Sequence, residues 1–167
     1  MRHGLRLFVI LVVLVLPLAS PAASPEQLYL LNCWGCHRAG AEGIKGSVPR
    51  IKGFGAYFLQ LSQGRTYFAS VPGVANSSLS NAEVAQVLNW MLTSFCKDQL
   101  PASFSPYQPK EIEQLRSKRM TDVIRVRRQL VDHLLAQGVI SRGAMEEDRA
   151  FNTPALSSQS TNGSASR

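Results

Sequence analysis

The hydrophobic and polar residues divide the chain into an apolar leader, a series of short amphipathic segments and a polar end. Residues 7–18 are an apolar run that follows two arginines, Arg2 and Arg6. In residues 24–137, apolar side chains recur three and four positions apart, which is the spacing of one helix face. The pattern therefore predicts a leader followed by several helices.

The first helix is predicted to begin at Ser24. Ser24 can cap the helix, Pro25 suits the first helical position, and Gln27 completes a capping box. The apolar residues that follow lead directly to Cys33. We therefore expect a short helix that positions the two cysteines at 33 and 36.

The next segment is rich in glycine. Residues 38–55 contain five glycines and are predicted to form a loop. Residues 56–61 and 65–69 are predicted to be two short helices, separated by a turn at 62–64.

The most regular pattern follows Ser80, which has Glu83 at the capping-box position. Apolar residues then recur at helical spacing, so one face of this helix should be buried. They are Val84, Val87, Leu88, Met91, Leu92 and Phe95. Cys96 follows and is predicted to be a small core residue, with an intermolecular disulfide as the alternative.

Residues 98–140 are predicted to be a linker and a helical extension. A proline-rich stretch at 101–109 precedes a polar helix at 111–119. Asp122 can cap a longer helix over 123–137, which Gly138 ends and which has Leu130 and Leu134 on its apolar face. Residues 141–167 are predicted to be a disordered tail.

The leader has the composition of a secretory signal peptide, residues 1–22, cut near Ala22. The alternative is an uncleaved membrane anchor, but the apolar run is shorter than the roughly 20 residues of a membrane span. Cleavage leaves 16 of the 18 basic residues against 11 acidic ones, so the net charge falls from +7 to +5. It also leaves only His37 and His133 as histidines. We expect a periplasmic protein that contacts a membrane only if the leader is retained.

Cys33, Cys36 and His37 form a C-x-x-C-H motif, which is the attachment signal of c-type haem. The two thiols can each add to a vinyl group of one haem, and the histidine can then ligate the iron. The alternatives are a thioredoxin-like dithiol, which needs a βαβ setting, and half of a zinc site, which needs a second ligand pair. The Pro49 carbonyl could accept a hydrogen bond from the second ring nitrogen of His37.

Three features in this order resemble a class I, mono-haem cytochrome c over residues 24–95. They are the helix that leads into the C-x-x-C-H motif, the proline loop around Pro49, and the helix from Leu79 with the aromatic Trp90. The resemblance implies an all-α fold around one covalent haem c with its iron, in a domain at 24–97, and transfer of one electron. Residues from 101 onward have no counterpart in the minimal domain of that family.

The resemblance also implies a methionine ligand on the far, or distal, side of the iron, in a Met-Pro pair ahead of the last helix. This chain has Val71-Pro72 at that place, and valine cannot ligate iron. Five side chains remain as candidates elsewhere, and a bound water or no ligand are the other options. The five are Met91, Met120, His133, Lys45 and Lys52.

Two groups of polar residues bear on binding. Arg50, Tyr57, Arg65 and Tyr67 are candidates to contact the haem propionates. A cluster of basic residues in the extension could steer an acidic redox partner. It comprises Arg116, Lys118, Arg119, Arg125, Arg127 and Arg128.

We therefore expect an electron carrier, or the cytochrome partner of a periplasmic dehydrogenase, and not an enzyme with an acid–base site of its own. The expected partner is a redox protein with an acidic docking surface, and neither nucleic acid nor a small-molecule substrate is expected. The alternatives are a haem-based binder or sensor of small ligands with an open distal site, and a haem subunit of a larger complex.

Overall fold

The structure, a computed structural model, describes residues 22–153 of the 167-residue chain. The predicted signal peptide, except Ala22, and the residues after 153 lie outside this part. The described residues form helices and contain no strand, apart from one isolated bridge between Ile44 and Val48. None of these helices is long and apolar enough to cross a membrane. The all-α prediction is confirmed.

The first two helices, α2 (Pro25–Asn32) and α3 (Trp34–His37), carry the C-x-x-C-H motif. Ser24 caps α2 as predicted: its hydroxyl accepts a hydrogen bond from the Gln27 N–H, and the Gln27 side chain accepts one from the Ser24 N–H. Cys33 lies at the junction, and its carbonyl accepts a hydrogen bond of 2.9 Å from the His37 N–H.

The glycine-rich loop leads into the 3-10 helix η1 (Gly55–Gln60), then α4 (Ser62–Ser70) and the single turn α5 (Pro72–Ala75). The predicted turn at 62–64 is wrong, because α4 already begins at Ser62. Gly64 lies inside α4, where a Cβ atom would overlap the Phe58 carbonyl. Glycine there permits α4 to approach η1 closely instead of breaking the helix.

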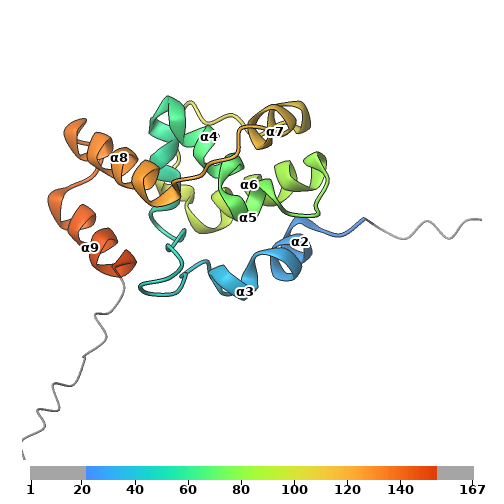
Figure 1. The fold of residues 1–167 in the computed structure, drawn as a ribbon, viewed down its shortest axis with the longest axis horizontal. Helices are drawn as coiled ribbons and strands as arrows, with labels where there is room; N and C mark the ends of the chain where they lie inside the picture. The colour runs from blue at the N-terminus through green and yellow to red at the C-terminus, as the bar shows by residue number, and fades with distance from the viewer. Residues whose placement is uncertain (1–21, 154–167) are drawn as a thin grey trace, which may run out of the picture.

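The longest helix within residues 22–153, α6 (Asn81–Phe95), packs across α2 (Figure 1). Its capping box at Ser80 and Glu83 forms as predicted. The contact with α2 is aromatic: the Tyr29 ring lies 5.4 Å from the Trp90 ring and 5.3 Å from the Phe95 ring, between centroids. Such pairs stabilise by about 0.5–1.5 kcal/mol beyond their burial.

The predicted linker after α6 is packed against the domain. It follows the short 3-10 helix η2 (Lys97–Gln99) and ends at α7 (Pro109–Arg116). Tyr107 is buried in it, donates its N–H to the Asn89 side chain and donates its hydroxyl to the Arg65 carbonyl. This segment is therefore fixed to both α6 and α4.

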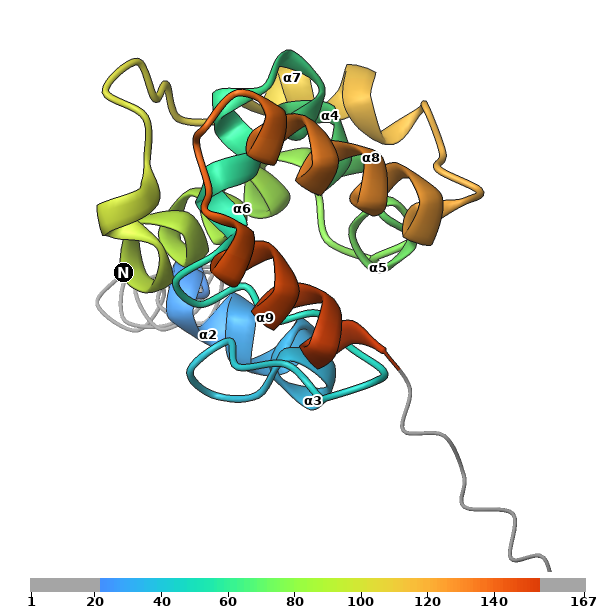
Figure 2. The same cartoon turned by 90° about the vertical axis from the view of Figure 1, so that its left-hand side faces the viewer.

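Two helices end the described chain, α8 (Val123–Ala136) and α9 (Arg142–Asn152). Asp122 caps α8 as predicted. The prediction of disorder over 141–167 is wrong for residues 142–152, because Ser141 caps α9 and the helix buries Met145 and Asp148. The predicted helical extension thus continues into a further helix, α9 (Figure 2).

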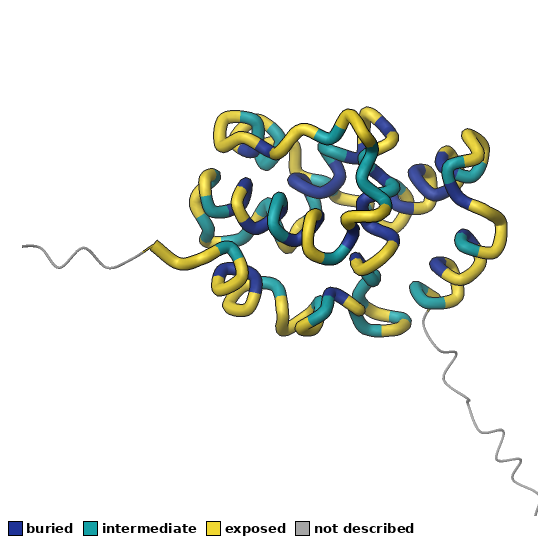
Figure 3. The backbone as a smooth tube through the Cα atoms, turned by 180° about the vertical axis from the view of Figure 1, so that it is seen from behind, coloured by how far each residue is buried: buried dark blue, intermediate teal, exposed yellow. Residues whose placement is uncertain are grey.

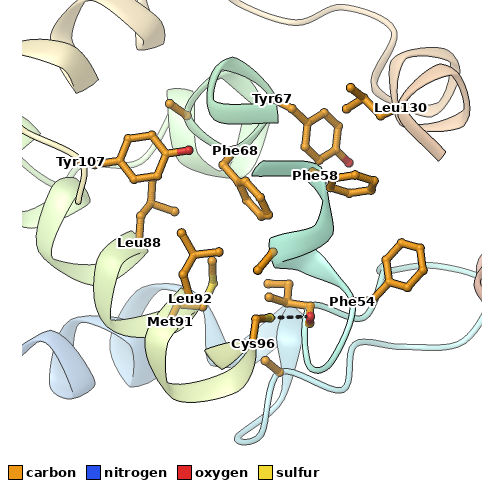
Figure 4. Close-up of a cluster of buried hydrophobic side chains, with 14 of the residues drawn as sticks. Phe54, Phe58, Tyr67, Phe68, Leu88, Met91, Leu92, Cys96, Tyr107 and Leu130 are labelled. Atoms are coloured by element: carbon orange, nitrogen blue, oxygen red, sulfur yellow. Dashed lines mark hydrogen bonds between the residues drawn. The ribbon is translucent and has the colours of Figure 1, made fainter. Parts of the chain in front are cut away.

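The core runs between these helices and is visible as the dark segments of Figure 3. Phe54, Phe58 and Tyr67 form successive edge-on contacts within it. Cys96 is 1% exposed, and its thiol donates a hydrogen bond of 2.9 Å to the Ile51 carbonyl (Figure 4). This position agrees with the prediction of a core cysteine.

Candidate functional site

A cavity of about 290 Å³ opens between the C-x-x-C-H motif and the helices that face it. Its wall includes Cys33, Cys36 and His37 together with parts of the proline loop, α4, α5, α6 and α8. Most of the lining side chains are apolar, as is usual for ligand sites. They include Ile51, Phe58, Phe68, Val71, Val74, Val84, Val87, Leu88, Met91 and Val123.

The two motif cysteines differ in exposure. Cys33 is partly buried, whereas Cys36, one turn later on α3, is exposed. Burial and the neighbouring Cys36 raise the pKa of the Cys33 thiol to about 11, so this thiol is protonated at neutral pH. The free thiols of both residues border the cavity.

His37 follows directly and is held at the cavity wall. Burial lowers the pKa of its imidazole, and the Pro49 carbonyl beside it opposes that shift with a smaller effect. The ring is therefore neutral at neutral pH, which is the form that ligates metals. Within residues 22–153, its buried Nδ1 atom has no hydrogen-bond partner. The predicted bond to Pro49 is thus present as a close approach and not as a formed hydrogen bond.

The proline loop has the backbone conformation that this approach requires. The Gly43 N–H donates to the His37 carbonyl at 3.0 Å, and Ile44 pairs with Val48. Gly43 has φ = +72°, and a Cβ atom there would overlap the Val48 carbonyl. Glycine at 43 therefore folds the loop back so that Pro49 reaches the histidine.

The four residues predicted to contact the haem propionates lie in two different places. Arg50 and Tyr67 line the cavity. Arg65 instead donates two hydrogen bonds of 2.7 Å to Glu111 on α7, and Tyr57 packs edge-on against Phe54; neither lines the cavity.

Sequence reasoning missed the position of Arg127. The sequence predicts it in a solvent-exposed basic cluster, but it lines the cavity from α8 and stacks on two aromatic rings, 4.9 Å from the Phe58 centroid and 5.6 Å from that of Phe54. The only signal in the sequence is its place three residues before Leu130, on the apolar face of α8.

The rest of the basic cluster is also dispersed. Arg116 donates hydrogen bonds to the carbonyls of Ser77 and Leu79, and Arg125 pairs with Asp122 on its own helix. Lys118, Arg119 and Arg128 are the members that remain exposed without an ion pair in the described structure. The predicted six-residue patch is therefore not a single surface.

The candidates for a second iron ligand lie in different places. Met91 is the single methionine among the residues that line the described cavity, and it is buried on α6 near Cys96 (Figure 4). His133, Lys45 and Lys52 are exposed and outside the lining. Met120 donates its backbone N–H to the Ser70 carbonyl, next to Val71, but its side chain is not part of the wall.

These residues fit a haem. The donor set is two thiols and a neutral imidazole in the order that covalent haem attachment requires. Most of the cavity wall is apolar. The buried Nε atom of Arg50 has no hydrogen-bond acceptor among residues 22–153, and a haem carboxylate would supply one. The alternatives are not supported: the described chain has no strand for a βαβ unit and no cluster of three residues that could hold another metal ion.

Comparison with known proteins also points to a haem protein. The sequence matches no family model. It is 30% identical over 122 residues to a cytochrome c-552 of Thermus thermophilus, covering 62% of this chain and 82% of that protein. A second cytochrome c-552 of the same species is 30% identical over 108 residues, covering 54% of this chain and 82% of that relative. Together with the helical fold, this match shows that the chain belongs to the class I c-type cytochromes, which carry covalent haem c and act in electron transfer.

Proposed function

We propose that this protein is an exported, periplasmic electron carrier in which Cys33 and Cys36 bind one haem and His37 ligates its iron. The observation that carries the proposal is the position of all three residues on the wall of one largely apolar cavity, with the imidazole neutral. Export follows from the leader at 1–22, because haem is attached to such motifs outside the bacterial cytoplasm.

The chain's own residues prepare the site for electron transfer. Bound haem supplies a one-electron couple between ferrous and ferric iron. The apolar wall excludes water, so charges near the cavity act through a low dielectric. Pro49 approaches the His37 ring, and His37 would ligate the iron through its imidazole. Arg50 and Arg127 line the cavity and would compensate the negative charge of the haem carboxylates.

The proposed partner is a redox protein with an acidic surface around an apolar contact. Leu31 and Trp34 flank Cys33 and are 79% and 50% exposed, so they form an apolar surface beside the haem attachment site. The net charge of +5 expected after cleavage would attract an acidic partner from a distance. Short-lived redox complexes bury little surface, which a small patch of this kind can supply. We include in this proposal that the partner is a periplasmic dehydrogenase.

A second candidate function is the binding of a small ligand at the iron. The observation that favours it is Val71, which lines the cavity in place of the methionine expected by resemblance, with Val74 beside it. These side chains leave the distal position without a ligand from the usual loop. On this view the open iron position, which would bind carbon monoxide in the reduced protein, is the functional site.

Haem attachment tests the main proposal. In the wild type, the haem should stay with the polypeptide after denaturation and acid–acetone extraction. Cys33→Ala and Cys36→Ala should each lose one thioether bond, and the double variant should release all its haem. Cys96→Ala is the matched control and should keep its haem. Complete extraction of haem from the wild type would contradict covalent attachment.

The role of His37 requires a separate measurement. His37→Ala in the haem-loaded protein should change the visible spectrum by removing the nitrogen ligand, and added imidazole should restore it. His133→Ala is the control and should leave the spectrum unchanged, because His133 is exposed and outside the cavity wall. An unchanged spectrum for His37→Ala would contradict the assignment.

A further inference from the structure

Arg127 and Asp148 form a buried ion pair at the cavity. Their side chains are 10% and 3% exposed, and the Arg127 Nη2 atom donates to the Asp148 carboxylate at 2.5 Å. Arg127 comes from α8 and Asp148 from α9, so the pair joins the last two helices. It is the most deeply buried ion pair in the described chain.

Burying two charges is costly, and a buried pair is weak evidence for added stability. Each ion loses several kcal/mol of hydration, which the attraction between the two repays only with good geometry. A second, exposed pair joins the same two helices: Arg149 of α9 and Asp132 of α8 lie 2.6 Å apart and are about half exposed. Because this pair already links α8 to α9, the buried pair calls for a reason connected with the cavity.

The two charges are not equally close to the cavity. Arg127 lines it, whereas Asp148 does not. The ion pair therefore presents its positive end to the site. Arg50 repeats this arrangement from the proline loop, since it lines the cavity and pairs at 2.5 Å with the exposed carboxylate of Glu147, the residue before Asp148.

The surroundings hold the guanidinium in place and add no compensating charge. Phe54 and Phe58 stack against it, and Tyr67 lies beside it. Burial raises the pKa of Tyr67 and the nearby Arg127 only partly opposes this, so the phenol is neutral at neutral pH. The charge that the cavity experiences from this side is that of Arg127, reduced by Asp148 behind it.

We propose that the Arg127–Asp148 pair sets the reduction potential of the haem: the charge of Arg127 acts on the iron, and Asp148 positions Arg127. The inference rests on the presence of haem in the cavity and not on the identity of the redox partner. A nearby cation favours ferrous over ferric iron, because the reduced centre carries one positive charge less. Asp148 moderates that effect and fixes the guanidinium against the aromatic rings.

Replacing Arg127 and replacing Asp148 should therefore shift the reduction potential of the haem in opposite directions. Replacing Arg127 with methionine removes the positive end of the pair and lowers the potential, whether or not Asp148 then takes up a proton. Replacing Asp148 with asparagine leaves the cation uncompensated and raises the potential. A pair that only held the fold together would give shifts of the same sign in both variants, because both would open the cavity to water.

The experiment is redox titration of the purified holoprotein with four variants. Arg127→Met should titrate at a lower potential than wild type and Asp148→Asn at a higher one. Arg149→Met and Asp132→Asn, which break the exposed pair between the same helices, are the matched controls and should titrate with the wild type. Shifts of the same sign for Arg127→Met and Asp148→Asn, or no shift in either, would overturn the proposal.

Conservative variants keep the test decisive if Arg127→Met does not fold. Arg127→Lys retains the cation and should stay within the wild-type range, while Asp148→Asn must still raise the potential. A fall in potential for Asp148→Asn would on its own count against this role of the ion pair. Covalent haem is measured first on each preparation. Its absence from the wild type would refute the proposed function, whereas the wrong shifts in potential in haem-loaded protein would refute only the role of the ion pair.

Discussion

At the scale of single residues, burial determines the protonation states around the cavity. It keeps His37 neutral and the Cys33 thiol protonated, and it raises the pKa of the Tyr29 hydroxyl to about 12. Tyr29 uses that hydroxyl to donate a 2.7 Å hydrogen bond to the Arg38 carbonyl, just after the histidine. The C-terminal end of the motif is thus anchored by a hydroxyl that does not titrate near neutral pH.

Cys96 provides a test at this scale. Burial raises its pKa, and its thiol is hydrogen-bonded to Ile51, so the thiolate needed for reaction is scarce. In the holoprotein, a thiol reagent should label Cys96 readily only after unfolding, and the native protein should react at least about ten times more slowly. Rapid labelling of the native protein, or a disulfide-linked dimer on a non-reducing gel, would show that Cys96 is accessible.

Gly64 provides a second test. Gly64→Ala should destabilise the protein by more than about 1 kcal/mol, since a Cβ atom would overlap the backbone of Phe58. Gly143→Ala in α9 is the control: its nearest contact would be 3.8 Å away, so helix propensity should make the change neutral or slightly stabilising. Denaturant unfolding of the two variants measures the difference, and equal stabilities would contradict the packing of α4 on η1.

At the scale of elements, local signals in the sequence predict the helices that begin with a cap. Ser24, Ser80 and Asp122 each accept the expected backbone hydrogen bond. The sequence misleads where tertiary contacts decide the outcome. Glycine usually ends a helix, which favours a turn at Gly64, and the composition of α9 resembles that of a polar tail.

The candidate site shows the same division. Cys33, Cys36 and His37 are evident from their spacing alone, and the cavity brings them together. The place of Arg127 could not be predicted, because a basic residue on an amphipathic helix usually faces water. Its burial depends on Asp148, which lies 21 positions away on a helix that the sequence pattern does not reveal.

The packing of α7 leads to a prediction about pH. Arg65 holds the pKa of Glu111 below its ordinary value of 4.5, so the ion pair stabilises the fold at neutral pH and is lost as the pH falls through the lowered pKa. Glu111→Gln should lower stability by about 1 kcal/mol or less at pH 7, with the difference vanishing in acid. Melting temperatures from pH 7 to pH 3 measure it.

Glu113→Gln is the matched control for that series. Glu113 is exposed on the same helix and has no ion pair within residues 22–153. The Glu113→Gln variant should have the melting temperature of the wild type at every pH in the series. A difference between Glu111→Gln and wild type that does not shrink as the pH falls would show that the side chain matters by packing and not by charge.

At the scale of the whole molecule, α9 packs against the proline loop, and α8 lines the cavity. The Gly46 N–H donates to the Phe151 carbonyl at 2.7 Å, and Arg50 pairs with Glu147, so α9 contacts the loop that carries Pro49 (Figure 2). The extension therefore reaches both the proline loop, through α9, and the cavity wall, through Arg127. The surface around Leu31 and Trp34 remains exposed for a partner.

Association with a redox partner should combine both features of this surface. Raising the ionic strength should slow electron transfer to an acidic acceptor, but only moderately, because few cations of the extension remain unpaired. Leu31→Ser should slow transfer at every salt concentration, with Ile124→Ser on α8 as an equally exposed control, 75% against 79%. Stopped-flow rates measure both, and rates independent of salt would contradict steering.

The coordination of the iron tests the account most directly. Visible and near-infrared spectra of the purified oxidised and reduced holoprotein report its ligands. We predict a c-type haem without a methionine–iron charge-transfer band, high-spin when oxidised, whose reduced spectrum shifts with carbon monoxide. A methionine–iron band, together with a reduced spectrum that carbon monoxide leaves unchanged, would contradict a haem whose one strong ligand from the protein is His37.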